Sequence, residues 1–334
     1  MNSFFEKKKS SVFVICSPFQ ALCAMEAIKE FEITDYHFIV GVRNEQRDKQ
    51  IESLLQQWNI SYEKIYLFDK KRILLNAIFS KKRKFDRAFI GDFRDSVLNF
   101  IALGFLSNKG CVVYLDDGNI TISYLQGIAK VQKAIITTCI YKIIIKLRFI
   151  VDRKIFFTLY SDIALKGFCC KQNNFSSIKS LLNNKKNKDD IYIIGTNISA
   201  YCEKLLIPLE NFKNSLKALI IFLQNKYKSK RIIYIPHGRD IQFFPQEICE
   251  ECGIEYLRLN EIVELYMLKL SYQPIAIYSW TSTALLNLKK IFPDTHCYNF
   301  LSDEICINGN KDYITISNYY EKNGIISIKI SDIM

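Results

Sequence analysis

The chain has 334 residues, of which 49% are apolar and 24% charged, so it is not a disordered chain and its length favours two domains over one core. Lys and Arg outnumber Asp and Glu by 46 to 34, which gives a formal net charge of +12. This basic excess predicts an anionic partner, which could be a nucleic acid, an anionic membrane surface or a phosphorylated substrate.

The 11 cysteines are an odd number without regular spacing, which argues against a disulfide framework. Cys249 and Cys252 form one CxxC pair, but the sequence has no second pair or nearby histidine to complete four zinc ligands. We therefore expect no bound metal and a reducing, cytoplasmic location. The apolar run Val12–Cys16 is too short for a signal sequence and predicts a first strand.

Short apolar runs alternate with helically spaced ones along the first half of the chain. Predicted strands cover Ser11–Cys16, Tyr36–Val42, Tyr62–Phe68, Arg87–Ile90 and Cys111–Leu115, and predicted helices cover Phe19–Phe31 and Glu45–Trp58. This alternation is typical of an α/β fold, in which helices cover both faces of a parallel sheet.

The polar run Leu181–Asp190 predicts a linker, after which the alternation resumes. Further strands are predicted at Ile191–Ile194, Arg231–Ile235, Glu255–Leu257, Pro274–Tyr278 and Thr295–Tyr298, and helices at Pro208–Tyr227, Glu261–Leu270 and Thr281–Lys290. We predict two Rossmann-like domains, residues 1–185 and 186–334, facing a cleft at the carboxyl ends of their strands. Such sheets bind their ligands at that edge.

The segment Ala134–Val151 is nearly continuously apolar, but Lys142, Lys146 and Arg148 interrupt it. A membrane-spanning helix would bury three charges, so we do not expect one. Two interpretations stay open: a core helix with one basic edge, or a basic amphipathic surface that lies on anionic lipid.

Two adjacent carboxylates, Asp116 and Asp117, follow a predicted buried strand and precede Gly118. Their mutual repulsion would raise one of the two pKa values, which suits a general base. The alternative is a turn in which Asp and Gly serve the backbone alone.

A second polar motif, Pro236-His237-Gly238-Arg239, ends a predicted strand of the second domain. A histidine can donate a hydrogen bond to a phosphate, and an arginine can donate two hydrogen bonds to the same phosphate. The other two histidines, His37 and His296, lie in predicted strands, and we expect them to be structural. The alternative for His237 is an ordinary turn with a polar tip.

A third motif places Ser279, Thr281, Ser282 and Thr283 at the end of a strand and the start of a helix. Helix-start amides and hydroxyl groups together can bind an anion without a metal. The alternative is an ordinary helix cap. The sequence lacks the GxxxxGK[ST] pattern, which excludes a P-loop.

Taken together, these motifs resemble those of bacterial sialyltransferases, most closely the lipooligosaccharide sialyltransferases of glycosyltransferase family 52. Asp116-Asp117-Gly118, Pro236-His237 and Ser279–Thr283 occur in the family's order. Ser17-Pro18-Phe19-Gln20 looks like its first-strand loop, and Ile194-Gly195-Thr196 like the start of its second domain. Asp240 departs from the family, which usually has Glu there.

The resemblance implies two domains of the GT-B type, a CMP-sialic acid donor, and no metal or other cofactor. The first domain would take the acceptor and the second the nucleotide sugar. Asp117 or Asp116 would be the base, and His237 would hydrogen-bond or protonate the departing phosphate. The residues implied to bind the donor are Gly195, Thr196, Pro236, Arg239, Glu264, Ser279, Thr281, Ser282 and Thr283, and those of the N-terminal loop are Ser17, Pro18 and Gln20.

The expected function is inverting transfer of sialic acid to a terminal sugar, taken to be galactose, of a lipooligosaccharide, O-antigen or capsule. The partners are then a nucleotide sugar and an oligosaccharide or lipid-linked glycan, with an anionic membrane surface and a homodimer as open expectations. Another donor, such as a different CMP-nonulosonate, CMP-Kdo or a UDP-hexose, is the alternative. An anionic-membrane or nucleic-acid binding protein is the rival class, but the sequence carries no known nucleic-acid module.

Overall fold

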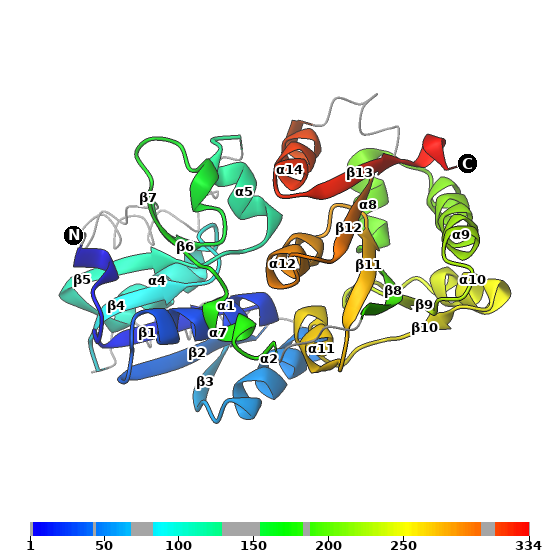
Figure 1. Ribbon diagram of the computed structural model, residues 1–334. Helices are drawn as coiled ribbons and strands as arrows, with labels where there is room; N and C mark the ends of the chain where they lie inside the picture. The colour runs from blue at the N-terminus through cyan, green and yellow to red at the C-terminus, as the bar shows by residue number, and fades with distance from the viewer. Residues whose placement is uncertain are drawn as a thin grey trace. The chain divides into compact units, whose positions relative to one another are not determined.

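The computed structural model describes residues 3–42, 45–67, 83–128, 154–182, 188–301 and 311–333. The chain divides into two compact units, Met1–Ser177 and Ile178–Met334, and each contains one parallel sheet (Figure 1). The boundary expected after residue 185 thus lies inside the second unit. The predicted linker Leu181–Asp190 is too long, because Lys188–Asp190 already belong to a strand.

The sheet of the first unit has seven strands in the order β3-β2-β1-β4-β5-β6-β7, and their pairings are parallel. The strands are β1 (Ser11–Ile15), β2 (Tyr36–Val42), β3 (Tyr62–Tyr66), β4 (Phe85–Ile90), β5 (Leu106–Tyr114), β6 (Ile155–Thr158) and β7 (Cys169–Gln172). The chain runs outward from β1 in one direction and then returns to β4 on its other side. This reversal makes the gap between β1 and β4 the position where doubly wound sheets take their ligands.

The helices of the first unit are α1 (Pro18–Glu30), α2 (Glu45–Gln57), α4 (Ser96–Phe105), α5 (Asn119–Leu125) and the short α7 (Ser176–Lys179), with 3₁₀ turns at Ser3–Phe5 and Ser161–Ile163. Two of these helices, α1 and α4, begin at side-chain caps. Ser17 caps α1, where Pro18 supplies a preset φ, and Asp95 caps α4 by accepting from the amides of Val97 and Leu98. Helices α4 and α5 and strands β6 and β7 were not among the predicted elements.

The second unit repeats the same winding in a six-stranded parallel sheet, ordered β10-β9-β8-β11-β12-β13. Its strands are β8 (Lys188–Ile194), β9 (Ile232–Ile235), β10 (Glu255–Tyr256), β11 (Gln273–Ser279), β12 (His296–Leu301) and β13 (Ile325–Lys329). Its helices are α8 (Ile198–Leu205), α9 (Leu209–Lys226), α10 (Phe244–Cys252), α11 (Val263–Lys269), α12 (Thr283–Ile291) and α14 (Lys311–Lys322), with a 3₁₀ turn at Ile330–Asp332. The reversal here lies between β8 and β11.

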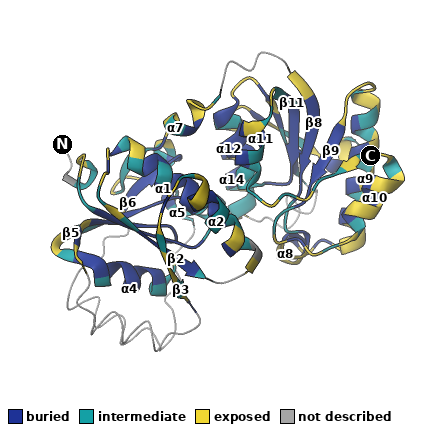
Figure 2. Cartoon of the chain, turned by 90° about the horizontal axis from the view of Figure 1, so that it is seen from below, coloured by how far each residue is buried: buried dark blue, intermediate teal, exposed yellow. Residues whose placement is uncertain are grey.

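The central strands are buried on both faces, which explains their continuous apolar runs (Figure 2). All five residues of β1 are buried. Its Phe13 stacks on Phe38 of β2 at 4.7 Å and on Phe89 of β4 at 4.8 Å between ring centroids. Each such pair contributes about 0.5–1.5 kcal/mol beyond area burial, so this aromatic row fixes the registration of β2, β1 and β4.

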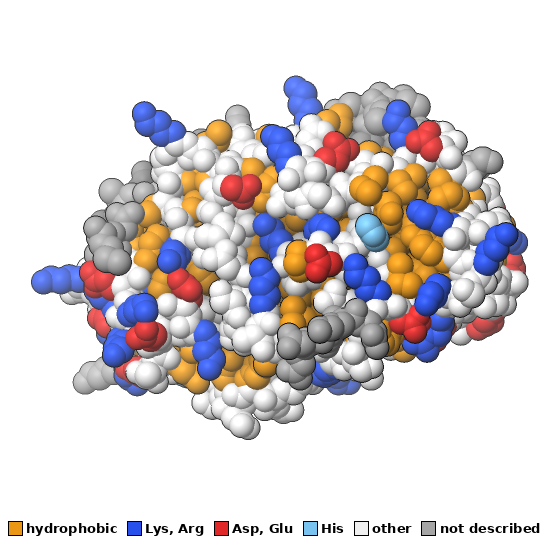
Figure 3. All heavy atoms as spheres, viewed as in Figure 1, with side chains coloured by type: hydrophobic (Ala, Val, Ile, Leu, Met, Phe, Trp, Pro, Cys, Tyr) orange, Lys and Arg blue, Asp and Glu red, His pale blue; other side chains and the backbone are white. Residues whose placement is uncertain are grey.

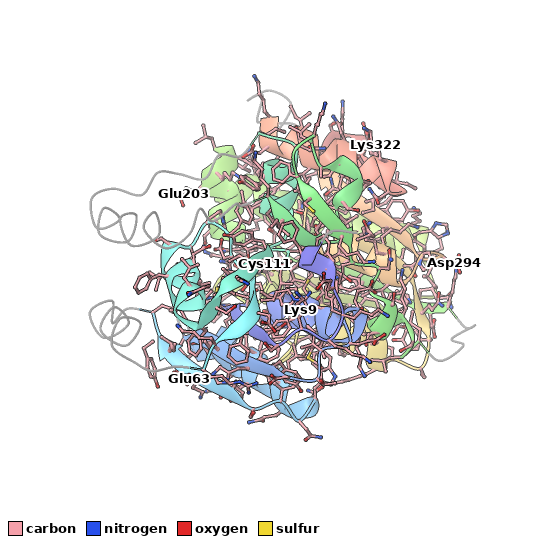
Figure 4. The ribbon with its side chains drawn as sticks, turned by 90° about the vertical axis from the view of Figure 1, so that its left-hand side faces the viewer. Lys9, Glu63, Cys111, Glu203, Asp294 and Lys322 are labelled. Carbon is pink, nitrogen blue, oxygen red and sulfur yellow. The ribbon has the colours of Figure 1, made fainter. Side chains whose placement is uncertain are left out.

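The N-terminal segment is fastened to the first unit by Arg87, a buried arginine of β4. Its guanidinium stacks on Phe31 at 4.8 Å and Phe89 at 4.9 Å and donates to the carbonyls of Phe4 and Glu6. Figure 4 labels Lys9, which lies between this anchored segment and the start of β1. Arg87 is at the first register position of β4 against β1, so this anchor lies away from the carboxyl ends of the strands.

Candidate functional site

Three loops of the first unit meet at the carboxyl ends of β1, β4 and β5. Ser17 and Gln20 follow β1, Asp92 and Arg94 follow β4, and Asp117 follows β5. Hydrogen bonds join these loops to one another, although they are far apart in the sequence. This cluster is the candidate site of the first unit.

Gln20 links the first loop to the third. Its side chain accepts from the amide of Cys16 at 2.8 Å through Oε1 and donates from Nε2 to Asp117 Oδ1 at 2.8 Å. The residue is 1% exposed, and it packs directly over Gly91. A Cβ at Gly91 would lie 2.8 Å from Gln20 Cγ and closer still to its Oε1, so only glycine leaves room for this side chain. Ser17 and Pro18 contribute indirectly, because they begin helix α1 and thereby determine where Gln20 lies.

Asp117 is held at both of its carboxylate oxygens. Gln20 contacts Oδ1, and the guanidinium of Arg94 contacts Oδ2. Burial and the neighbouring charge of Asp92 raise the pKa of Asp117 to about 6, against the lowering effect of Arg94 and Gln20. A carboxylate with such a pKa is a stronger base than an exposed aspartate and is still largely ionised at neutral pH.

Asp116 has a different environment, although it is the direct neighbour of Asp117. It is fully buried, and its carboxylate accepts from the hydroxyl of Thr158 and from the amide of Leu159 at 2.8 Å. Asp116 therefore joins β5 to the end of β6. Repulsion between the two adjacent carboxylates was the expected cause of a raised pKa, and this was wrong: the charge that raises the pKa of Asp117 after burial is Asp92.

The backbone conformation after Asp116 and Asp117 explains why the next residue, Gly118, is a glycine. Gly118 has φ 70° and ψ −147°, a backbone region that is essentially restricted to glycine, and it is the N-cap of α5. The amide of Asp117 donates to Thr121 Oγ1 at 2.9 Å in the first turn of that helix. The sharp turn at Gly118 thus separates the strand from the helix and leaves Asp117 at the edge of the sheet.

In the second unit, the loop after β8 contains Gly195 and Thr196. A Cβ at Gly195 would lie 2.6 Å from the hydroxyl oxygen of Tyr234 on β9 and 3.2 Å from the Cα of Pro236. Glycine is therefore required here by packing inside the unit. Thr196 is half-buried and lies directly at the carboxyl end of β8.

His237 follows β9, after the buried Pro236. The backbone amide of Arg239 donates to its Nδ1 at 3.1 Å, so the hydrogen of the neutral ring is on Nε2. Burial, with a smaller effect of Arg239, lowers the pKa of His237 to about 4. The imidazole is consequently neutral at pH 7 and offers one N–H donor. Arg239 itself is exposed.

Asp240 shapes this loop from inside. It is 3% exposed, its amide donates to the carbonyl of His237 at 2.8 Å, and its own carbonyl accepts from Arg258 at 3.2 Å. Burial raises the pKa of its carboxyl. The backbone of Asp240 thus stabilises the turn around His237. Its carboxylate, at the position where the resembling family usually has Glu, accepts from the amide of Gln242 at 3.4 Å.

The hydroxyl residues after β11 separate into two groups. Ser279 is fully buried and donates to the carbonyl of Ile194 at 2.6 Å, and the amide of Thr281 donates to Asn299 Oδ1 at 2.7 Å. Both contacts hold the loop to its own sheet. Ser282 is the N-cap of α12 and Thr283 its first residue, and both are half-buried.

Glu264 lies in the first turn of α11 and is 5% exposed. Asn287 of α12 donates to its Oε1 at 2.8 Å, and burial raises the pKa of its carboxyl. In this structure Glu264, which the resemblance implies to bind the donor, therefore joins two helices of the second unit.

The remaining sequence expectations concern metal and membrane. Cys249 is buried in α10, and burial raises the pKa of its thiol to about 12, which is the behaviour of a core cysteine. Within the described ranges, no group of three or more His, Cys, Asp or Glu side chains is placed to hold a metal ion. None of the described helices has the length and apolarity needed to cross a bilayer. The basic apolar segment Lys133–Arg153 lies outside the described residues.

Asp92 and Arg94 are the members of this cluster that sequence reasoning missed. A signal was present, because Gly91-Asp92-Phe93-Arg94 follows the predicted strand Arg87–Ile90 directly. Charged residues at the carboxyl end of a strand next to the reversal of a doubly wound sheet are candidates by position alone.

Comparison with solved structures supports the fold, whereas two other comparisons find no match. No protein-family model matches the chain, and no curated protein matches it. Among solved structures, it is similar to an α/β-galactoside α-2,3-sialyltransferase from the luminous marine bacterium Photobacterium phosphoreum, with a TM-score of 0.53, 14% identity and coverage of 98% of this chain and 100% of that one.

Two further solved structures have a similar fold. A UDP-N-acetylglucosamine 2-epimerase has a TM-score of 0.52 and 10% identity, with coverage of 93% of this chain and 91% of that one. UGT89C1 of Arabidopsis thaliana, complexed with UDP-L-rhamnose, has a TM-score of 0.52 and 11% identity, with coverage of 97% and 85%. The sequence prediction of the fold is confirmed: the chain has two Rossmann-like units of the GT-B type.

Proposed function

We propose that the chain is an inverting glycosyltransferase that transfers sialic acid from CMP-sialic acid. The observation that carries this proposal is the placement of Asp117, a carboxylate with a pKa of about 6, at the ligand-binding edge of the first sheet. The GT-B fold and the three sequence motifs support this proposal. One motif supplies Asp117 as a base, and another supplies His237 as a hydrogen-bond donor to the phosphate.

Asp117 is the proposed base. The hydroxyl oxygen of the acceptor attacks the anomeric carbon of the donor while its proton passes to Asp117, so one O–H bond breaks and another forms. The bond between the anomeric carbon and the phosphate oxygen breaks, and its electron pair leaves with CMP. A single displacement of this kind inverts the configuration at the anomeric carbon. Asp116, buried against Thr158 and Leu159, is the structural member of the pair.

His237 is the proposed partner of the departing phosphate. As a neutral ring with its hydrogen on Nε2, it donates a hydrogen bond to an oxygen whose negative charge grows as the glycosidic bond breaks. Arg239 adds a positive charge on the same loop.

We assign the remaining contacts with the nucleotide sugar according to how far each residue is exposed. Thr196, Ser282 and Thr283 are half-buried at the carboxyl ends of β8 and β11, and we propose that they contact the phosphate or the sugar carboxylate. Gly195, Pro236, Ser279 and Thr281 would support these contacts from behind, because they are buried. Glu264 could contact a ribose only if its bond with Asn287 opened.

The proposed acceptor is a terminal galactose of a bacterial surface glycan, and the proposed site of action is the cytoplasmic side of the membrane. Neither a metal nor another cofactor takes part in this proposal. The rival class, a nucleic-acid or anionic-membrane binding protein, would use the +12 charge directly. On the face shown in Figure 3, basic side chains are scattered among apolar and acidic ones, which does not favour a continuous nucleic-acid track there.

The test is release of the nucleotide from a panel of nucleotide sugars: CMP-sialic acid, CMP-Kdo, UDP-galactose and UDP-N-acetylglucosamine, each with and without lactose as acceptor. We expect CMP release from CMP-sialic acid, faster with lactose and unchanged by EDTA. UDP release would instead support a UDP-sugar donor. If no donor is consumed while the protein binds duplex DNA or anionic vesicles, the rival class is correct.

A further inference from the structure

The guanidinium of Arg94 lies between two carboxylates. Its Nε is 3.0 Å from Asp92 Oδ1 and one terminal nitrogen is 3.2 Å from Asp92 Oδ2, so the pair is bidentate. The backbone amide of Arg94 also donates to Asp92 Oδ1, at 2.9 Å. The same terminal nitrogen contacts Oδ2 of Asp117. Asp92 thus closes a ring with the side chain and main chain of Arg94.

This ring restrains a side chain that would otherwise be mobile. The Arg94 side chain is 43% exposed, whereas the side chains of Asp92 and Asp117 are 11% and 18% exposed. A half-exposed arginine loses rotamer entropy when it is fixed, and the planar fork with a carboxylate offsets that cost better than a single contact does. Asp92 therefore determines where the positive charge beside Asp117 lies.

Asp92 and Arg94 act on Asp117 in opposite electrostatic directions. The negative charge of Asp92 raises the pKa of Asp117, and Arg94 lowers it. Gln20 of α1 also contacts Asp117 and carries no charge. Asp116 is turned away toward Thr158, so Asp92 and Arg94 are the charged groups that face Asp117 here. Because Asp92 offsets much of the arginine's charge, Arg94 can orient Asp117 without making it a weak base.

We propose that Asp92 and Arg94 are positioning residues: Asp92 fixes the Arg94 guanidinium, and Arg94 fixes Oδ2 of Asp117 so that its remaining lone pairs face the acceptor hydroxyl. This inference rests on the proposed function, in which Asp117 is the base. Gln20 fixes the other oxygen in the same way. Each carboxylate oxygen then keeps one acceptor position for the incoming proton.

The test compares Asp92→Asn and Arg94→Gln in the full chain by the pH dependence of kcat/KM. We expect the acidic limb to move to lower pH in Asp92→Asn, because asparagine keeps an oxygen that accepts from Arg94 but no longer opposes the charge of Arg94 at Asp117. We expect it to move to higher pH in Arg94→Gln. Arg94→Lys keeps the charge without the fork, so its limb should stay nearer that of the wild type while kcat falls by up to about 10²-fold.

The matched control is Asp95→Asn, in the same loop. Asp95 caps α4, and asparagine caps a helix equally well, so this variant should keep the wild-type profile. Limb shifts in the same direction for Asp92→Asn and Arg94→Gln would overturn the inference, and so would the absence of a shift in both. General damage to the fold cannot produce two shifts of opposite sign.

A second readout does not depend on turnover. The carboxyl carbon of Asp117, assigned by its loss in Asp117→Asn, can be titrated by NMR in the wild type and the same variants. Midpoints that move down in Asp92→Asn and up in Arg94→Gln would support the arrangement even if every nucleotide sugar were refused, in which case the proposed function alone fails. Unmoved midpoints would overturn the inference even in an active transferase.

Discussion

Gln20 Nε2 donates a hydrogen bond of 2.8 Å to Asp117 Oδ1, across 97 residues of sequence. The bond joins the loop after β1 to the loop after β5, on either side of the loop that carries Asp92 and Arg94. It can form because Gly91 has no side chain where Gln20 packs. The orientation of the proposed base thus depends on a glycine and an amide that carry no charge.

Gly91→Ala should lower activity through Gln20. The added methyl group would lie 2.8 Å from Gln20 Cγ and overlap its Oε1, so the glutamine must leave its position over β4 and release Asp117. We expect kcat to fall by up to about 10²-fold, with a smaller change in the KM of the donor, because the proposed donor contacts belong to the second unit. Steady-state kinetics of the purified variant measures both.

A double-mutant cycle shows whether this loss passes through Gln20. In the Gln20→Ala background, the side chain that the new methyl group would displace is absent, so Gly91→Ala should cost little more. If the two losses in kcat multiply as independent effects, Gly91 acts by another route and the explanation is wrong.

Asp117→Asn and Asp116→Asn should fail in different ways. Asp117→Asn removes the proton acceptor, so we expect turnover to fall by about 10²–10⁴-fold with donor binding retained. Asp116→Asn puts an amide where two donors, Thr158 and Leu159, both need an acceptor. It should therefore lower the free energy of unfolding by about 1–3 kcal/mol. Denaturant unfolding and donor-binding calorimetry on both variants separate these outcomes, and near-normal turnover of Asp117→Asn would refute the base assignment.

The stability of the protein should depend on the charge of Asp117. Its pKa of about 6 in the folded chain lies above the ordinary value of 3.8, so the folded state holds its proton more tightly than the unfolded state. The stability contributed by this group is therefore present below about pH 4 and is lost as pH rises to about 6. Asp117→Asn should remove this pH-dependent loss of stability, because asparagine does not ionise.

We expect the difference in free energy of unfolding between Asp117→Asn and wild type to be more favourable to the variant at pH 7.5 than at pH 4. Urea titrations at the two values measure it. Asp294→Asn, which replaces an exposed aspartate of the second unit, is the control for the substitution itself. A difference that is equal at both values would mean that the pKa of Asp117 is not raised.

The sequence predicted the fold well because burial on both faces leaves a clear pattern. The predicted strand Tyr36–Val42 matches β2 at both ends, and helix Glu45–Trp58 differs from α2 by one residue. Strand β7 (Cys169–Gln172) was not predicted, because its four residues are half-buried and lack a continuous apolar run. Helix α5 is only seven residues long, too short to establish a helical period.

The site was predictable in its motifs and less so in its contacts. Asp117 and His237 were singled out because each follows a predicted strand beside a glycine or proline, and Gln20 was named through the resemblance of its loop to that of the sialyltransferase family. The sequence could not show that Ser279 and Glu264 would turn inward, because a hydroxyl or carboxyl group at a loop is equally compatible with a ligand or with a buried partner such as the Ile194 carbonyl. Such a choice depends on side-chain pairing across strands that are distant in sequence.

His237 should act as a hydrogen-bond donor through Nε2 and not as a cation. Its Nδ1 accepts from the amide of Arg239, and its pKa is lowered to about 4, so the ring is neutral throughout the range in which Asp117 is ionised. Nitrogen NMR of the unliganded protein at pH 7 should show the Nε2–H tautomer for this histidine. Its assignment follows from the signal that His237→Ala lacks.

The kinetic counterpart uses two substitutions of His237. His237→Gln can present an amide N–H near the position of Nε2 and should retain more kcat with CMP-sialic acid than His237→Ala, because the interaction strengthens as charge develops on the phosphate. The KM of the acceptor should change little in either variant. Equal kcat values for the two variants, or a change confined to the acceptor KM, would assign His237 to the structure of its loop instead of to the leaving phosphate.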